Sequence, residues 1–183
     1  NLQAGFDNFP LLAVPFFILA AEIMSTGAIS RLLLRFASQF VGHLRGGLGY
    51  ANVLTGTLFA GISGSALASA AGPGAMMARM MERSGYSKAY AGALTISVAV
   101  IDPIIPPSIP MVLYALISNA SIGYLFLAGI LPGLLMGLML MIVVFFTARR
   151  DNFPVEEPVP LRELPGVTAR ALPALMMPVV LLG

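Results

Sequence analysis

Residues 101–110 read IDPIIPPSIP, which places one acidic residue and four prolines inside a long run of apolar residues. Proline lacks a backbone N–H and clashes with the carbonyl four residues earlier, so this segment interrupts any helix that contains it. The interruption leaves carbonyls near residues 101–106 without helical partners, beside the hydroxyl of Ser108 and the carboxylate of Asp102. The decapeptide therefore predicts a broken helix with polar groups gathered at the break.

The composition around this decapeptide is that of an integral membrane protein. Of the 183 residues, 58% are hydrophobic and 10% are charged, and the mean hydropathy is +0.91. We therefore expect an all-α, multi-pass fold in a lipid bilayer, because hydrocarbon cannot satisfy free backbone groups. The net charge of +2 gives no reason to expect nucleic-acid binding, and the absence of cysteine excludes disulfides and thiol chemistry. The missing initiator methionine and a short apolar C-terminal run lead us to expect a piece of a longer chain.

Apolar runs and their interruptions divide the chain into seven segments. Two runs are long enough to cross a bilayer as single helices, and two others are interrupted by glycine, serine or proline. The second long run carries Gly129, Gly133 and Gly137 at four-residue spacing, which allows another helix to approach closely. The predicted segments are a transmembrane helix (1–29), an amphipathic interfacial helix (30–47), a re-entrant hairpin (48–87), a broken transmembrane helix (88–121), a transmembrane helix (122–148), a cytoplasmic loop (149–172) and the start of a truncated transmembrane helix (173–183).

The basic residues indicate how these segments cross the membrane. All ten lie on the cytoplasmic side if the apolar part of the hairpin, 48–81, enters and returns on that side. Charge alone does not distinguish two short spans from a re-entrant hairpin. Length favours the hairpin, because about 16 residues per arm reach only ~24 Å. The ten residues are Arg31, Arg35, Arg45, Arg79, Arg83, Lys88, Arg149, Arg150, Arg162 and Arg170.

The expected hairpin tip, GISGSALASAAGPGAMM at 61–77, is rich in small and hydroxyl residues. Ser63, Ser65 and Ser69 offer oxygens beside freed carbonyls, which suit a hard cation such as Na⁺. Alternatively, the small residues only let the two hairpin arms pack closely. Two interrupted segments in one chain are typical of the ion and substrate site of a secondary transporter, which favours transport over a non-transporting scaffold.

Asp102 allows two interpretations that are compatible with each other. A carboxylate at membrane depth is costly and therefore indicates a functional role. Asp102 could equally cap a half-helix that begins at Pro103, since an acid followed by proline is a good helix start.

An enzyme is a weaker alternative. Gly61-Ile62-Ser63-Gly64 fits the GxSG pattern of intramembrane serine proteases, which need a histidine base. The one histidine, His43, lies in an interfacial segment beside Arg45 and is poorly placed for that role. Glu22, near the end of the first span, is expected to pair with a basic residue or to reach the interface. We therefore predict that the chain is not an enzyme.

Several motifs in order resemble the large membrane subunit (DctM family) of TRAP transporters, the tripartite ATP-independent periplasmic transporters. They are FPLLAVPFFILAAEIM (9–24), QFVGHLRGGLGYANVL (39–54), LFAGISGSALASAA (58–71), PIIPPSIPMVLYAL (103–116) and SIGYLFLAGILPGLL (121–135). The resemblance implies a sodium-coupled importer of organic anions, such as C4-dicarboxylates or sialic acid, in the bacterial inner membrane. It also implies a periplasmic solute-binding protein, a small DctQ-type membrane subunit, and an elevator motion. This chain would be roughly the first inverted-repeat half.

The resemblance also implies where the ion and the substrate would bind. The implied sodium ligands are Ser63, Gly64 and Ser65 in the hairpin and Asp102, Ile105 and Pro107 at the break, while Ser69 and Ser108 would face the substrate.

The chain departs from the family pattern at two of these positions. Ser69 stands where many family members have an acid, and Asp102 stands where they usually have glycine. We interpret this as a relocation of one carboxylate across one site. If Asp102 joins the ion shell, its carboxylate could favour H⁺ over Na⁺.

Overall fold

The computed structural model describes residues 19, 28–153 and 155, and this part of the chain is helical and contains no named strand. Within it, α9 (Ile122–Arg150) is the one helix that is long and apolar enough to cross a membrane, judged by length and composition. The predicted span 1–29, with Glu22, lies almost entirely outside the described residues. The predicted segments 149–172 and 173–183 also lie mostly or wholly outside them.

Helix α3 (Ala28–Val41) is amphipathic, with Leu33 and Ala37 buried and Arg35 exposed. It packs against α4 (Gly47–Ser63). The helix predicted over 30–47 ends earlier in the structure, and turns occupy the residues before α4. Two glycines explain the early end. A Cβ on Gly42 would lie 2.5 Å from the Ser38 carbonyl oxygen, and Gly46 has a φ of 82° that favours glycine.

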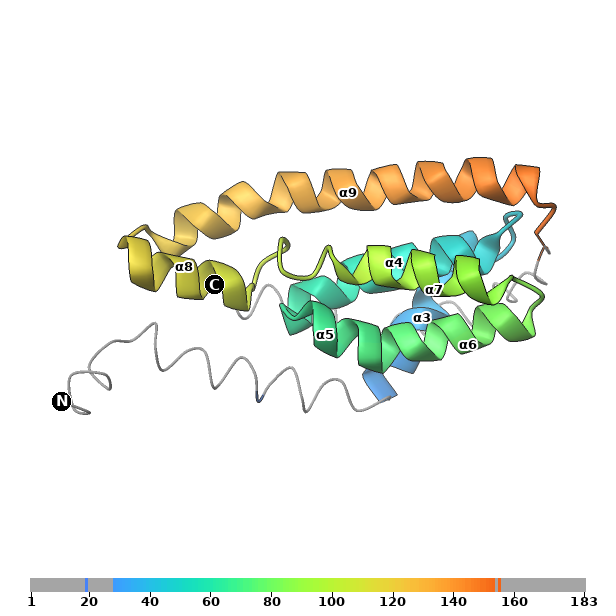
Figure 1. Ribbon diagram of the computed structural model, residues 1–183, viewed down its shortest axis with the longest axis horizontal. Helices are drawn as coiled ribbons and strands as arrows, with labels where there is room; N and C mark the ends of the chain where they lie inside the picture. The colour runs from blue at the N-terminus through green and yellow to red at the C-terminus, as the bar shows by residue number, and fades with distance from the viewer. Residues whose placement is uncertain (1–18, 20–27, 154, 156–183) are drawn as a thin grey trace.

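The segment after α3 forms a helical hairpin. Its first arm is α4, and its second arm consists of α5 (Ala66–Ser69), the π-helix η1 (Ala70–Gly74) and α6 (Ala75–Arg83), as Figure 1 shows. The chain reverses at Gly64, whose φ is 61°. Ser65 then caps α5, because its hydroxyl accepts from the Ala68 N–H at 3.4 Å. The π-helix carries Pro73, which cannot donate a helical hydrogen bond.

The proline-rich segment breaks a helix. Helix α7 (Lys88–Ala99) ends before it, α8 (Ile109–Ser118) begins after it, and residues 100–108 form turns. The alternative in which Asp102 caps a half-helix beginning at Pro103 is wrong. Ser108 is the cap, because its hydroxyl accepts from the Met111 N–H at 3.3 Å. The helix cannot start earlier because prolines restrict the preceding residues away from helical geometry.

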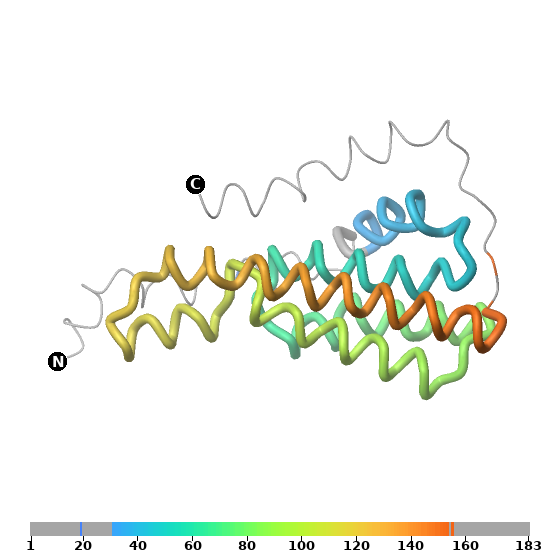
Figure 2. Tube along the Cα trace, turned by 90° about the horizontal axis from the view of Figure 1, so that it is seen from above, coloured from blue at the N-terminus to red at the C-terminus, as the bar shows by residue number. Residues whose placement is uncertain are grey.

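Helix α9 runs alongside both the hairpin and the broken helix (Figures 1 and 2). Its glycine face is buried, and the prediction that another helix approaches it closely is confirmed at Gly137, beside α4, and at Gly129, beside Met111 of α8, whereas at Gly133 the neighbour is the non-helical break. A Cβ on Gly137 would lie 3.0 Å from the Thr57 hydroxyl of α4. At Gly133 a Cβ would collide with the side chain of Ile105, and at Gly129 with the carbonyl of Ile104. The break therefore packs on this face as closely as a helix does.

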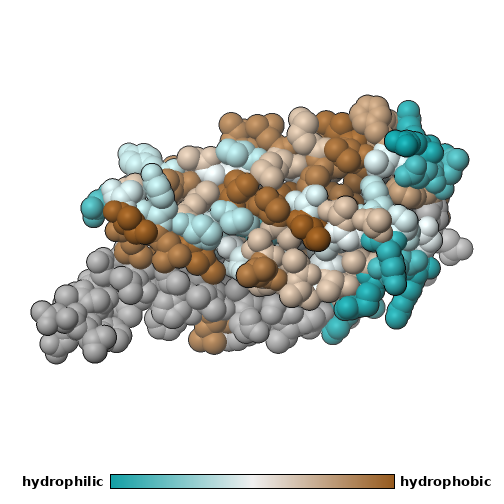
Figure 3. All heavy atoms as spheres, viewed as in Figure 1, coloured by the Kyte–Doolittle hydropathy of each residue, from teal (hydrophilic) through white to brown (hydrophobic). Residues whose placement is uncertain are grey.

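The described basic residues are exposed. Figure 3 shows hydrophilic residues gathered at one end of the molecule, with hydrophobic side chains over much of the rest of this face. At this end the α3–α4 loop meets the residues after α9, where the Arg45 guanidinium donates to the Asn152 side chain at 3.0 Å. We call this end the charged end. The hairpin tip lies away from it, near the middle of α9 (Figure 1).

Candidate functional site

The hairpin tip lies directly against the break. A Cβ on Gly64 would collide with the carbonyl oxygen of Pro107, so the two backbones touch at this point. Ser63 is buried at the end of α4, and its hydroxyl donates to the Ser65 carbonyl at 3.4 Å. Four of the predicted sodium residues, Ser63, Gly64, Ser65 and Pro107, are thus brought together. They combine a hydroxyl with carbonyls at the end of a helix, which is the oxygen-rich setting that a hard cation prefers.

The remaining break residues have other neighbours. The Ser108 hydroxyl donates to the Pro103 carbonyl at 2.6 Å, and Ser108 is only 1% exposed. Its predicted contact with substrate stays a prediction, but its hydroxyl is already used to close the break and to cap α8. The Ile105 side chain packs on α9. The hydrophobic side chain thereby anchors the break, and only the Ile105 backbone carbonyl could serve an ion.

Asp102 points toward the second arm of the hairpin. Its Oδ2 accepts a hydrogen bond from the Ser69 hydroxyl, and both residues are buried. The Ser63 hydroxyl also lies within hydrogen-bonding reach of the Asp102 carboxylate. The two positions at which this chain departs from the family pattern, 69 and 102, are therefore in direct contact. This contact is what a relocated carboxylate requires, although its role toward an ion stays a prediction.

Behind Asp102 lies a small cavity that the sequence motifs did not indicate, and much of its wall is apolar, including Met77 and Val98. Its volume is about 10 Å³, and its polar lining consists of Asn52, Thr55, Ser69, Thr95 and Asp102. The Asn52 amide donates to the Thr95 hydroxyl at 3.0 Å, which joins α4 to α7. One signal could have pointed to these residues. Asn52 and Thr55 are three residues apart in an otherwise apolar stretch, so a helix places them on one face.

The geometry gives no support to the serine-protease alternative. Ser63 ends α4, whereas His43 is exposed in the loop before its first residue. A helix of 17 residues is roughly 26 Å long, so His43 cannot reach the Ser63 hydroxyl. No group of three or more histidine, cysteine, aspartate or glutamate side chains that could hold a metal occurs in the described part of the chain. The described oxygens near the tip are those of hydroxyls, backbone carbonyls and the Asp102 carboxylate.

Comparison with known proteins identifies the family. Residues 1–183 match the family model described as "Tripartite ATP-independent periplasmic transporter, DctM component". The chain belongs to the DctM family. It is 43% identical over 177 residues to the C4-dicarboxylate TRAP transporter large permease protein DctM of Pseudomonas aeruginosa, covering 97% of this chain and 42% of that protein.

Two further DctM-family relatives carry other substrate names. The chain is 41% identical over 183 residues to the sialic acid TRAP transporter large permease protein SiaM of Vibrio cholerae, covering 100% of this chain and 43% of the relative. It is also 41% identical over 183 residues to the 2,3-diketo-L-gulonate TRAP transporter large permease protein YiaN of Escherichia coli, with the same coverage of 100% and 43%. These relatives are transport proteins, in agreement with the prediction that the chain is not an enzyme. The chain spans about two fifths of their length.

Proposed function

We propose that this chain is part of the large permease subunit of a sodium-coupled importer of organic anions. The observation that supports this most is the contact between the hairpin tip and the helix break beside a buried carboxylate. Irregular backbone at membrane depth is tolerated where it is buried in protein or lines a wet cavity, and such breaks form the binding sites of secondary transporters. A scaffold that only packs helices would have no need to bury Asp102.

The packing of α4 on α9 supports a re-entrant hairpin. Gly46 lies against Ala148, and Thr57 lies against Gly137, so eleven residues of α4 pass eleven residues of α9 in the opposite direction. If this one-to-one pairing continues, Ser63 lies beside about residue 131 of α9. That residue is roughly 14 Å along the helix axis from the N-terminus of α9. If α9 spans the membrane with its basic end in the cytoplasm, the tip ends inside the bilayer.

In this proposal the tip binds the coupling sodium ion. The Ser63 hydroxyl and the carbonyls around Gly64 and Ser65 face the carbonyls of the break around Ile105 and Pro107. Ser65 keeps its hydroxyl on the α5 N-terminus, so it would offer its backbone oxygen. Asp102 is buried beside Ser69 on the second arm of the hairpin, and its negative charge favours a cation nearby.

The substrate of the whole protein is proposed to be a small organic acid. The names of the relatives specify C4-dicarboxylate, sialic acid and 2,3-diketo-L-gulonate, all of which carry a carboxylate. The N-terminus of α8 lies beside the tip at Ser108, and helix N-termini favour anions. We propose that the substrate arrives on a periplasmic binding protein, that a small DctQ-type subunit assembles with the permease in the inner membrane, and that the hairpin and broken helix move as an elevator.

Uptake by the complete complex in proteoliposomes tests this function. An inward Na⁺ gradient together with the cognate binding protein should drive uptake of an organic acid, and removal of either should abolish it. Ser63→Ala should raise the Na⁺ concentration needed for half-maximal uptake by about tenfold, since a lost ligand is worth ~1.4 kcal/mol.

Ser97→Ala is the matched control. Its hydroxyl donates to the Ala93 carbonyl on an exposed face of α7, so the Na⁺ dependence should not change. If the intact complex shows no uptake that depends on the Na⁺ gradient, a non-transporting scaffold subunit is favoured instead.

A further inference from the structure

An apolar groove lies between the end of α7 and the middle of α9. Its volume is about 460 Å³, and its walls include Ser97 and Val100 of α7 and Leu135, Met139 and Val143 of α9. The three α9 side chains are 47%, 53% and 48% exposed, so the groove is open at the surface. Ser97 is the one polar residue in the lining, and its hydroxyl already donates to a carbonyl of its own helix at 2.8 Å. The groove therefore offers apolar contact to an occupant.

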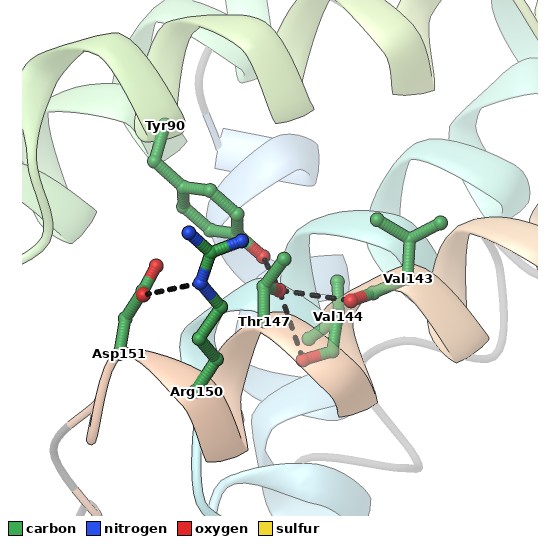
Figure 4. Close-up of polar contacts among 6 residues, drawn as sticks. All are labelled: Tyr90, Val143, Val144, Thr147, Arg150 and Asp151. Carbon is green, nitrogen blue, oxygen red and sulfur yellow. Dashed lines mark hydrogen bonds and ion pairs between the residues drawn. The ribbon is translucent and has the colours of Figure 1, made fainter.

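Toward the charged end, the seam between α7 and α9 closes and a basic side chain follows. The Tyr90 hydroxyl of α7 bonds to the Thr147 hydroxyl of α9 at 2.7 Å, one helical turn beyond Val143. Arg150 is seven residues after Val143, so an α-helix places both on one face. In Figure 4 the Arg150 side chain extends from α9 in the direction of Tyr90. One end of the apolar groove is thus marked by a positive charge.

The Arg150 guanidinium is available to an anion. Its side chain is 87% exposed, and its Nε lies 3.9 Å from Oδ1 of Asp151. An exposed ion pair at this distance is weak, and a guanidinium has further N–H donors that fit the oxygens of a phosphate. The neighbouring Arg149 differs, because its guanidinium lies over the Phe145 ring, 4.1 Å from the ring centroid.

The spacing of the groove and the arginine matches the dimensions of one lipid leaflet. Along the axis of α9, Val143 lies about 10 Å and Leu135 about 22 Å from Arg150. A bilayer has a hydrocarbon core of about 30 Å, with headgroup regions of roughly 5–7 Å on either side. With Arg150 at the level of the headgroups, the groove extends from just inside the hydrocarbon to about the centre of the bilayer. An acyl chain of a single leaflet covers this range.

The side chains of the groove suit a lipid chain better than another helix. Helices that pack closely in a membrane use small residues at the contact, and the small-residue face of α9, Gly129, Gly133 and Gly137, is already covered by α4, α8 and the break. The groove is instead lined mainly by Leu, Met and Val side chains. Long, flexible side chains of this kind adapt to an irregular apolar ligand.

We propose that the groove between α7 and α9, together with Arg150, is a binding site for one anionic phospholipid of the leaflet at the charged end. One acyl chain lies in the groove, and the lipid phosphate accepts hydrogen bonds from the Arg150 guanidinium. The bound lipid covers the seam that the Tyr90–Thr147 hydrogen bond closes. The inference rests on the part of the proposed function that places α9 across the membrane, and it is independent of the coupling ion and of transport.

Native mass spectrometry of the purified full-length permease complex in detergent measures the bound lipid. The complex is titrated with phosphatidylglycerol, which is anionic, and in parallel with phosphatidylcholine, which has no net charge. The wild type should have one site that prefers phosphatidylglycerol by about fivefold, the factor expected for one basic residue at a membrane surface. Arg150→Gln should abolish this preference. Val143→Phe fills the groove and should weaken the binding of both lipids at this site.

Matched controls lie next to both positions. Arg149→Gln removes the same charge from the neighbouring residue, whose guanidinium lies over Phe145, and should keep the preference for phosphatidylglycerol. Ile142→Phe adds an aromatic ring at a residue that is 40% exposed and does not line the groove, so the binding of both lipids should stay at the wild-type level.

Two results would overturn the proposal. Equal loss of the preference in Arg149→Gln and Arg150→Gln would show that phosphatidylglycerol responds to the overall charge of this end and has no defined site. Wild-type binding of both lipids in Val143→Phe would show that another protein segment covers the groove. Both results are read from lipid binding alone, so they are distinct from a failure of the complex to transport.

Discussion

The charged end and the region around the hairpin tip differ in how fully their buried polar groups are paired. At the charged end, the Tyr90 hydroxyl bonds to the Thr147 hydroxyl at 2.7 Å, and that hydroxyl donates in turn to carbonyls of α9 (Figure 4). Near the tip, Thr55 and Asp102 each keep one buried oxygen unpaired. Hydrogen bonds join elements in both regions, since Ser69 bonds to Asp102 and Asn52 to Thr95, but the region near the tip also keeps buried oxygens without a partner. In the proposed function, the charged end stabilises the fold and the tip binds ligands.

Glycines at the two ends provide the strongest test of this comparison. Gly64 and Gly85 both have positive φ angles, 61° and 92°, so alanine is strained at either position. Only at Gly64 would the added Cβ collide with backbone, the Pro107 carbonyl, while nothing lies within 4 Å at Gly85. Gly64→Ala should therefore abolish Na⁺-driven uptake in proteoliposomes, because the tip and the break must separate.

Gly85→Ala shares the conformational strain without the collision. It should cost about 1 kcal/mol of stability and leave the uptake rate per folded complex near that of the wild type. Equal loss of uptake in the two variants would show that strain alone explains the effect and that the tip contact has no special role.

The glycine face of α9 gives the next largest effect. Alanine normally stabilises a helix by up to about 1 kcal/mol relative to glycine. At Gly129 the added methyl would collide with the Ile104 carbonyl, so overpacking should reverse the sign and destabilise by about 1–3 kcal/mol. Gly123 on the same helix has only the Ser121 hydroxyl near, at 3.8 Å, so Gly123→Ala should be neutral or stabilising. Thermal unfolding of the purified complex measures both, and a stabilised Gly129→Ala would show that the break does not pack on α9.

The sequence predicted the framework of the site better than its interior. The prolines of 103–110 require a break, and the spacing of Gly129, Gly133 and Gly137 requires close packing, because both depend on backbone sterics that are local in sequence. The cavity formed by Asn52, Thr55 and Thr95 could not be predicted in this way. Its members are up to 43 residues apart, and they meet only after α4 and α7 have packed.

Asp102 illustrates both outcomes. The sequence identified it as a costly buried acid, and the family resemblance connected it with position 69, which it contacts in the structure. The alternative that Asp102 caps a helix is wrong, because Ser108 is the cap. The cap depends on which residue first escapes the restriction imposed by the following prolines, and that residue is Ser108. The sodium ligands and the coupling ion remain predictions. Every residue carries the same backbone carbonyl, so the sequence does not show which carbonyls at the break bind an ion.

A smaller effect is expected at the charged end. Tyr90→Phe removes a hydrogen bond to Thr147, while Thr147 keeps its bonds to the α9 carbonyls. The ring stays packed against Phe153, with 4.8 Å between ring centroids. Stability should fall by about 0.5–1.5 kcal/mol with uptake unchanged. A double-mutant cycle with Thr147→Val, read from thermal unfolding, should show coupling between the two. Strict additivity would mean that the bond does not hold α7 to α9.

The smallest effect is expected for Arg45→Gln. The guanidinium contacts the Asn152 amide on an exposed surface, where water replaces a lost partner at little cost, so stability should change by no more than about 0.5 kcal/mol. Arg45 is one of the ten basic residues predicted to lie on the cytoplasmic side. Membrane orientation depends on the total number of these residues, so the loss of one should not change it. Arg45→Gln should therefore leave both uptake and the accessibility of a reporter group at the charged end unchanged. A large loss of uptake from this one substitution would mean that the charged end takes part in transport, and the division of roles between the two ends would have to be abandoned.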